Sequence, residues 1–279
     1  MRTANIDGRL ALVQGSVALD VERASGGRFG ADPQAVFDRW DEFREWAAGV
    51  DVTAGAEIGA ACRGAVAPAP RQVFAIGLNY ADHAAEGNVE PPKSPPTFTK
   101  FLSSLAGPYE EVVLPAETVD WEVELVAVIG KTAIQVARED AWDYVAGLTV
   151  GQDLSERRLQ TVGPAPQFSL GKSFPGFGPM GPELVSVDEF SDPDDLELGC
   201  SVNGVLMQKG RTSGMIFSVP ELIARISAVC TLYPGDVIFT GTPGGVGAAR
   251  DPRVFLKPGD ELVSYVEGIG TIRQRMVAS

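Results

Sequence analysis

The chain has 279 residues, 44% hydrophobic and 22% charged, a composition typical of globular proteins. Its 37 acidic and 23 basic residues give a net charge of −14, which argues against a nucleic-acid partner or an anionic membrane surface. Because we find no spanning-length apolar run, no secretory signal and no paired spacing of the three cysteines, we expect a cytoplasmic protein.

Residues 1–69 are expected to form a small N-terminal α/β domain, and residues 70–279 a larger one. Residues 8–30 alternate loosely between apolar and polar side chains and contain turn glycines, which predicts a short β-meander. The Gly-, Ala- and Pro-rich residues 64–70 predict a linker between the two domains.

A helix is predicted over residues 33–48. Asp32 is suited to cap it and Gly49 to end it, and apolar side chains recur at helical spacing between them. Because the stripe is rich in aromatic residues, it indicates core packing rather than a cofactor site.

His83 is the only histidine in the chain. Histidine exchanges protons near neutral pH, and Glu86 lies three residues further along a short helix predicted over 81–86. The two residues are therefore either an acid/base pair or an exposed surface pair. The proline-rich residues 87–96 that follow are either a lid over a site or an ordinary surface connection.

The strand predicted over Trp121–Ile129 carries two acidic residues at one end. Residues two apart share a face of a strand, so Glu122 and Glu124 should lie side by side. The strand is apolar on both faces, which indicates burial. At an effective dielectric near 20, two carboxylates about 6–7 Å apart repel by roughly 2–3 kcal/mol, which a divalent cation removes. The alternative is a solvated acidic edge.

Asp153 follows an apolar run and is a candidate third ligand. An all-oxygen site favours Mg²⁺, with Mn²⁺ or Ca²⁺ possible, over Zn²⁺. Arg157 and Gln160 lie close behind it, and Lys172 stands among small and apolar residues. These residues either meet the acidic site or belong to a solvated helix face and a surface turn.

The glycines of residues 241–247 follow a predicted strand but lack the Gly-Lys-Ser/Thr ending of a phosphate-binding loop. We interpret the segment as a tight turn that brings backbone close to a pocket.

The larger domain is expected to be β-rich, with a rolled or barrel-like core, because short strands follow one another with few helices between them. Besides the strand at 121–129, the candidates are Val73–Gly77, Leu196–Val202, Asp236–Thr240 and Glu261–Val266. One further helix is predicted over 219–229, with Ser218 and Glu221 as a capping box and Leu222, Ile226 and Val229 on one face.

An ordered set of motifs beyond residue 70 resembles the fumarylacetoacetate hydrolase family, in its acylpyruvase and 2-oxo-hepta-ene-dioate isomerase-like branch. The motifs are Gly77-Leu78-Asn79-Tyr80 with Asp82-His83-Ala84 and Glu86, Phe98-Thr99-Lys100 with Ser103-Ser104, Trp121-Glu122-Val123-Glu124-Leu125, Asp153 with Ser155, Arg157 and Gln160, Gly171-Lys172-Ser173-Phe174, Val202-Asn203-Gly204, Pro234-Gly235-Asp236, and Gly241-Thr242-Pro243 with Gly245-Val246-Gly247. Each motif is weak alone, whereas the ordered set is specific.

The resemblance implies a mixed β-sandwich roll behind a small N-terminal domain, a homodimer, and activity on small anionic 2-oxo or 2,4-dioxo acids with Mg²⁺ or Mn²⁺. It implies metal ligands at Glu122, Glu124 and Asp153, an acid/base dyad of His83 and Glu86, polarising or oxyanion-binding groups at Lys172, Arg157 and Gln160, and a pocket residue at Thr242. The chain departs from the family pattern at Gln152, Arg158 and Pro175, which bear on substrate identity more than on metal binding.

The implied reaction is hydrolysis of a carbon–carbon bond in a 2,4-dioxo acid such as an acylpyruvate, giving pyruvate and a carboxylic acid. The same site would also suit oxaloacetate decarboxylation, or isomerisation or hydration of a 2-oxo dienoate, because fold-level likeness does not choose among them. A third possibility is a non-catalytic binding protein in which the acids hold a structural cation.

Overall fold

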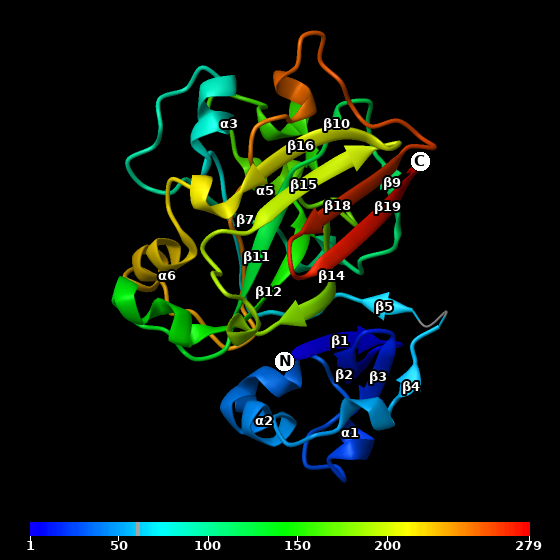
Figure 1. Cartoon of the computed structure of the whole chain (residues 1–279). Coiled ribbons are helices and arrows are strands. Elements are labelled where there is room, and N and C mark those ends of the chain that lie inside the picture. The colour runs from blue at the N-terminus through cyan, green and yellow to red at the C-terminus, as the bar shows by residue number, and fades with distance from the viewer. Residues whose placement is uncertain (60–61) are drawn as a thin grey trace.

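The computed structural model describes residues 1–59 and 62–279, and strands dominate it (Figure 1). A mixed twelve-stranded sheet has the order β4-β3-β2-β1-β14-β12-β11-β17-β6-β7, with β5 paired to β1 and β8 to β14. Its strands are β1 (Arg2–Ile6), β2 (Arg9–Gln14), β3 (Val17–Asp20), β4 (Ala56–Glu57), β5 (Arg63–Gly64), β6 (Val73–Ile76), β7 (Thr97–Thr99), β8 (Leu105–Ala106), β11 (Val123–Ile129), β12 (Val145–Gln152), β14 (Gly178–Val185) and β17 (Val237–Phe239).

A second sheet of five strands has the order β16-β15-β18-β19-β9, and β10 pairs with β13. These strands are β9 (Glu111–Leu114), β10 (Val119–Asp120), β13 (Ser155–Glu156), β15 (Glu197–Val202), β16 (Val205–Arg211), β18 (Glu261–Val266) and β19 (Gly270–Ala278). The helices are short: α1 (Val21–Ala24), α2 (Trp40–Ala47), α3 (Ala81–Glu86), α4 (Arg157–Gln160), α5 (Phe168–Gly171) and α6 (Val219–Ser227). This sheet-rich architecture confirms the predicted fold class.

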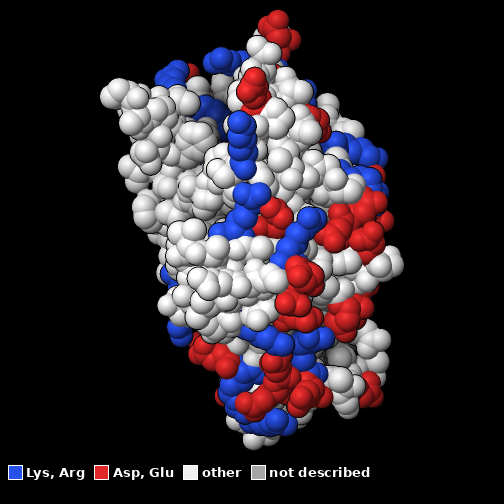
Figure 2. Space-filling model, turned by 90° about the vertical axis from the view of Figure 1, so that its left-hand side faces the viewer, with Lys and Arg blue, Asp and Glu red and all other residues white. Residues whose placement is uncertain are grey.

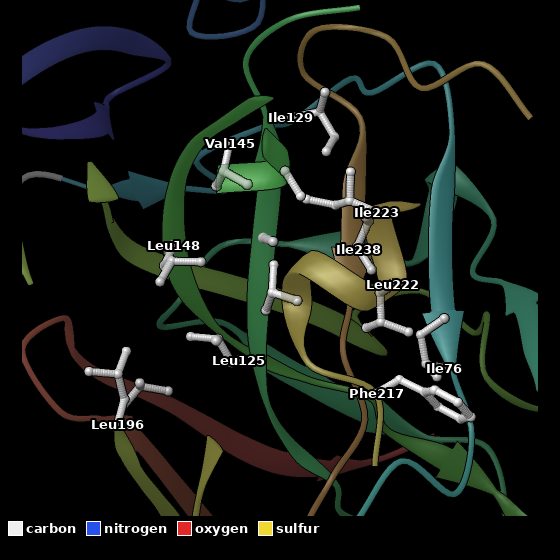
Figure 3. Packing of buried hydrophobic residues seen from close by; sticks show 14 of the residues in the cluster. Ile76, Leu125, Ile129, Val145, Leu148, Leu196, Phe217, Leu222, Ile223 and Ile238 are labelled. Carbon is white, nitrogen blue, oxygen red and sulfur yellow. The ribbon is translucent and has the colours of Figure 1, made fainter. Parts of the chain in front are cut away.

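Strand β11 is buried on both faces, as its sequence predicted. Leu125 belongs to a hydrophobic cluster that includes Leu222 and Ile223 of α6, and Figure 3 shows these three side chains among the packed residues of that cluster. Val126, on the opposite face, belongs to a separate cluster with the aromatic side chains of α2, including Trp40. Burying a side chain of this size contributes roughly 1.5–3 kcal/mol, so the strand that carries the acidic pair is firmly held.

The strands β6, β11, β15, β17 and β18 lie within their predicted ranges, and α3 has its predicted bounds. The continuous helix predicted over 33–48 is wrong, because Ala35–Arg39 is a 3₁₀ helix and α2 begins at Trp40. The meander predicted over 8–30 is correct only as far as Asp20, since α1 follows. A periodic apolar stripe determines which side chains are buried, but it does not distinguish one helical hydrogen-bond pattern from another.

The capping box predicted for α6 is also wrong. Ser218 occupies the N-cap position, but its Oγ is buried and has no hydrogen-bond partner within residues 1–59 and 62–279, and Glu221 instead pairs with Arg225 at 2.6 Å. Val229 lies beyond the end of the helix and is 86% exposed, so it does not share the buried face of Leu222.

The N-terminal strands extend the large sheet at one end of the molecule, while α3 lies at the opposite end (Figure 1). The join is the antiparallel pairing of β1 with β14, in which Arg2 is opposite Val185. The division of the chain after residue 69 stays a prediction.

The charge is mixed over the surface that Figure 2 shows, where acidic and basic side chains alternate. In the part of the chain that the structure describes, no helix has both the length and the apolar character needed to cross a membrane.

Candidate active site

Three buried carboxylates meet where β11 begins and β12 ends. Glu122 directly precedes β11, Glu124 lies within it, and Asp153 directly follows β12. The antiparallel pairing of the two strands lets the Asp153 N–H donate to the carbonyl of Glu122 at 2.9 Å. Each residue contributes a carboxylate oxygen to a group in which all lie within 4.8 Å of one another. The structure therefore brings together the three acids that the sequence proposed as ligands.

Glu124 carries an unsatisfied oxygen in this cluster. Its Oε2 accepts a hydrogen bond from the Gly241 N–H at 2.8 Å, but its Oε1 is buried with no hydrogen-bond partner among the described residues. Burial raises the pKa of Glu124, and the negative charges of Asp153 and Glu122 raise it further. An oxygen-only donor set with an unpaired buried carboxylate oxygen fits a hard divalent cation such as Mg²⁺ or Mn²⁺.

Two buried lysines face the same acids. Lys172 Nζ donates to Glu122 Oε2 at 2.8 Å and to Asp153 Oδ2 at 2.6 Å. Lys100 Nζ donates to Asp153 Oδ1 at 2.6 Å and to the carbonyl oxygen of Lys172. Counted as ionised, the three carboxylates exceed the two ammonium groups by one negative charge, and the neighbouring Arg157 and Asp120 cancel each other in this count. A bound divalent cation would more than offset that excess.

Burial lowers the pKa of Lys100 despite the opposing charge of Asp153. For Lys172 burial acts in the same direction, but the charges of Asp153 and Glu122 outweigh it and raise the pKa of the ammonium group. Lys172 is therefore the more firmly protonated of the two lysines.

Arg157, on α4, lies beside the cluster. It donates to Asp120 Oδ2 at 2.9 Å through Nε, and to Glu122 Oε1 at 2.6 Å and Gln160 Oε1 at 3.0 Å through Nη1. Burial acts to raise the pKa of Glu122, but the positive charges of Lys172 and Arg157 outweigh it and hold this pKa well below its usual range. Arg157 thus keeps Glu122 ionised and fixes one of its oxygens.

His83 and Glu86 lie one turn apart on α3, with His83 Nδ1 3.4 Å from Glu86 Oε2. Their side chains are 16% and 24% exposed, so the pair is accessible to a small substrate. A positive charge on the His83 imidazole would act to lower the pKa of Glu122, so α3 is within electrostatic reach of the acid cluster. The Gly245 N–H donates to both oxygens of Glu86, at 3.1 and 2.9 Å.

Thr242 has its hydroxyl group occupied by protein partners. Its Oγ1 donates to the carbonyl of Val123 at 2.8 Å and accepts from Gln208 Nε2 at 2.8 Å. These hydrogen bonds connect the loop after β17 to the start of β11, next to Glu122 and Glu124.

One of the three departures from the family pattern contacts the acidic site. Gln152 Oε1 accepts from the Glu122 N–H at 2.8 Å, and its Nε2 donates to Ser264 at 2.8 Å, so it fixes the backbone of a proposed ligand. Arg158 and Pro175 are exposed.

Sequence reasoning gave no role to three residues that the structure brings to this site. Lys100 is the last residue of the motif Phe98-Thr99-Lys100. Asp120 lies two residues before Glu122, so the rule that residues two apart share a face of a strand would have placed Asp120 beside Glu122. Gln208 accepts from the Val123 N–H at 2.9 Å as well as binding Thr242, and nothing local in the sequence indicates this.

Comparison with known families identifies a match over residues 72–277 to the fumarylacetoacetate (FAA) hydrolase C-terminal domain. Oxaloacetate tautomerase FAHD2A, a mitochondrial protein of Homo sapiens, is 49% identical over 210 residues, which cover 75% of this chain and 67% of that protein.

Solved structures resemble the whole chain. A putative HpcE protein from Mycobacterium smegmatis matches with a TM-score of 0.97 and 56% identity, covering 100% of both chains. Maleylpyruvate hydrolase from Sphingobium sp. SYK-6, in complex with manganese(II) ion and pyruvate, matches with a TM-score of 0.83 and 30% identity, again over 100% of both chains. The relatives thus include both a tautomerase and a hydrolase.

Proposed function

The chain belongs to the fumarylacetoacetate hydrolase family, and on this premise we propose that it hydrolyses a carbon–carbon bond in a 2,4-dioxo acid. The products are pyruvate and a carboxylic acid. The observation that carries the proposal is the combination of three clustered, buried carboxylates with a separate His83–Glu86 pair. A cation site alone would suit a binding protein, whereas the added imidazole provides a proton acceptor.

Glu122, Glu124 and Asp153 are the proposed ligands of a divalent cation, Mg²⁺ or Mn²⁺. A cation held by these residues would supply a Lewis acid that stabilises negative charge developing on the substrate oxygens. The donor set and the unpaired Oε1 of Glu124 support this assignment. The manganese(II) and pyruvate present in the maleylpyruvate hydrolase structure are consistent with it.

His83 is the proposed general base. A neutral imidazole that donates Nδ1–H to Glu86 keeps the lone pair of Nε2 free to take a proton from water. The resulting hydroxide attacks the 4-carbonyl, the C3–C4 bond breaks, and its electron pair stays on C3 of the pyruvate enolate. His83 then returns the proton to C3. General-base catalysis of this kind is typically worth about 10²–10⁴-fold.

Lys172 and Gln160 are the proposed donors to the tetrahedral oxyanion, and the loss of one such donor typically costs roughly 10²–10³ in rate. Lys172 Nζ donates to Glu122 Oε2 and Asp153 Oδ2, which keeps its ammonium group beside the proposed ligands. Arg157 Nη1 donates to Gln160 Oε1 and so orients the Gln160 amide. In this proposal the backbone beside Thr242 forms part of the pocket wall.

Proton transfer on oxaloacetate is a second candidate, favoured by the 49% identity to a tautomerase. Tautomerisation requires His83 to move a proton between carbon and oxygen without an attacking water. Decarboxylation of oxaloacetate, or isomerisation of a 2-oxo dienoate, would use the same ligands. The homodimer and the cytoplasmic location expected from the sequence also stay predictions.

The two candidates are distinguished by supplying acetylpyruvate and oxaloacetate separately to the Mn²⁺-loaded protein. Hydrolysis predicts equimolar acetate and pyruvate from acetylpyruvate, and His83→Ala should slow the release of both by about 10²–10⁴-fold while leaving Mn²⁺ affinity nearly unchanged. Decay of the oxaloacetate enol absorbance, with no pyruvate released from acetylpyruvate or from a longer acylpyruvate, would overturn hydrolysis in favour of the second candidate. Equal activity of His83→Ala on acetylpyruvate would remove His83 as the base.

A further inference from the structure

The backbone of Gly245 connects the acid/base pair to the rest of the site. Its N–H donates to both carboxylate oxygens of Glu86, and Glu86 Oε2 faces His83 Nδ1 at 3.4 Å. Glu86 is a long side chain at the protein surface, so ordering it has a cost in side-chain entropy. Two hydrogen bonds from one fixed N–H orient the carboxylate, and with it the imidazole.

Position 245 accommodates only glycine. Gly245 has a φ of +107°, a conformation that residues with a Cβ rarely adopt. A Cβ at this position would also lie 2.3 Å from the carbonyl oxygen of Met207, inside van der Waals contact. The backbone is therefore packed closely against β16, and the direction of the Gly245 N–H depends on what holds this residue and its two flanking peptides there.

The carbonyl of Gly245 is held by two side chains. It accepts from Trp121 Nε1 at 3.2 Å and from Arg250, whose Nε and Nη2 lie at 3.4 and 3.2 Å. Arg250 Nη2 also donates to the Met207 carbonyl at 2.7 Å, and its guanidinium lies 5.9 Å from the centroid of the Trp121 ring. Arg250 thus ties Gly245 to β16 and to the residue that directly precedes Glu122.

We propose that Arg250 is a positioning residue for the His83–Glu86 pair, acting through the backbone of Gly245. Its guanidinium fixes the Gly245 carbonyl, the fixed backbone presents its N–H to Glu86, and Glu86 then selects the imidazole tautomer with hydrogen on Nδ1. The catalytic consequence rests on the proposed function, because a base is needed only if the reaction removes a proton. The structural consequence is independent of any substrate.

The test uses tag-free, ¹⁵N-histidine-labelled protein, in which His83 gives the only histidine ring signal. A long-range ¹H–¹⁵N spectrum at mildly alkaline pH reports the tautomer directly. We expect mainly the Nδ1–H form in the native protein. In Arg250→Met the signal should move toward the Nε2–H form that free histidine prefers, and Arg250→Lys should restore part of the native signal.

Arg253→Met is the matched control, because Arg253 is exposed three residues further along the chain. It should leave the tautomer unchanged. In Mn²⁺-loaded protein, Arg250→Met should lower kcat about tenfold, the size of effect that loss of an orienting partner typically has. KM and Mn²⁺ affinity should change by less than about twofold, because the lost interaction acts in the transition state.

A native tautomer in folded Arg250→Met would overturn the proposal, whatever the activity. If that variant fails to fold, Arg250→Ala decides by the same spectrum, and a tautomer like that of Arg253→Met would again refute the role of Arg250. Loss of the Nδ1–H form in a protein that turns over no 2-oxo acid would support the positioning role and reject only the proposed reaction.

Discussion

Replacing Lys100 by Met tests whether the buried lysines balance the acid cluster. The Lys100 ammonium lies 2.6 Å from Asp153 Oδ1, and its side chain is fully buried. At an effective dielectric near 20 the attraction at this distance is about 6 kcal/mol before desolvation is subtracted. Removing one partner of a buried pair typically costs about 3–5 kcal/mol. Because Lys172 still contacts the other oxygen of Asp153, we expect a loss of about 3 kcal/mol, at the lower end of that range.

The assay is urea unfolding of Lys100→Met and the native protein, each with a chelator and with saturating Mn²⁺. The difference in unfolding free energy should be about 3 kcal/mol in chelator and should narrow with Mn²⁺, because a bound cation replaces the missing positive charge. The control is Lys131→Met, whose exposed pair with Asp41 at 3.5 Å should contribute under about 1 kcal/mol. A Lys100→Met difference as small as that of the control, or one that Mn²⁺ does not narrow, would refute this reasoning.

Three further predictions address the base, the backbone and the pH dependence. His83→Ala should lower kcat by about 10²–10⁴-fold with Mn²⁺ affinity retained, and steady-state kinetics with Mn²⁺ titration would show otherwise if both fell together. Gly241→Ala should cost about 1–3 kcal/mol in urea unfolding, because φ is +99° and a Cβ would lie 2.6 Å from that of Asn79; an unchanged midpoint would contradict this. Hydrogen bonds from Arg9 hold the pKa of Asp20 below its usual value, so the carboxylate contributes stability at neutral pH that is lost as the pH falls through this lowered pKa. Asp20→Asn should therefore lower stability by up to about 1 kcal/mol at neutral pH and by less in acid, and a loss independent of pH would exclude the ion pair as its cause.

The acidic part of the site was predictable because it depends on local patterns. The period of a strand places Glu122 and Glu124 on one face, and apolar residues on both faces of β11 indicate that the strand is buried. Asp153 follows the next strand of the same antiparallel pair, which brings it opposite Glu122. The sequence also contains only one imidazole, so no choice among histidines was needed.

The buried lysine side chains and the hydrogen bonds that support the site were not predictable from local patterns. A lone lysine is normally solvated, and the burial of Lys100 depends on contacts with Asp153 and Lys172, 53 and 72 positions away in the chain. Arg250 acts through a backbone carbonyl, which leaves no pattern in the sequence. The capping box expected at Ser218 failed for a different reason, since Glu221 pairs instead with Arg225 four residues further along the same helix.

The most direct test of the account is pyruvate release from acetylpyruvate by chelator-stripped protein, with and without added Mn²⁺, alongside Glu124→Gln. We expect release only when Mn²⁺ is present, and its loss in Glu124→Gln, because this substitution removes the carboxylate that has an unpaired buried oxygen. Release that continues in chelator, or that is unchanged in Glu124→Gln, would contradict the central claim that the three acids hold the catalytic cation.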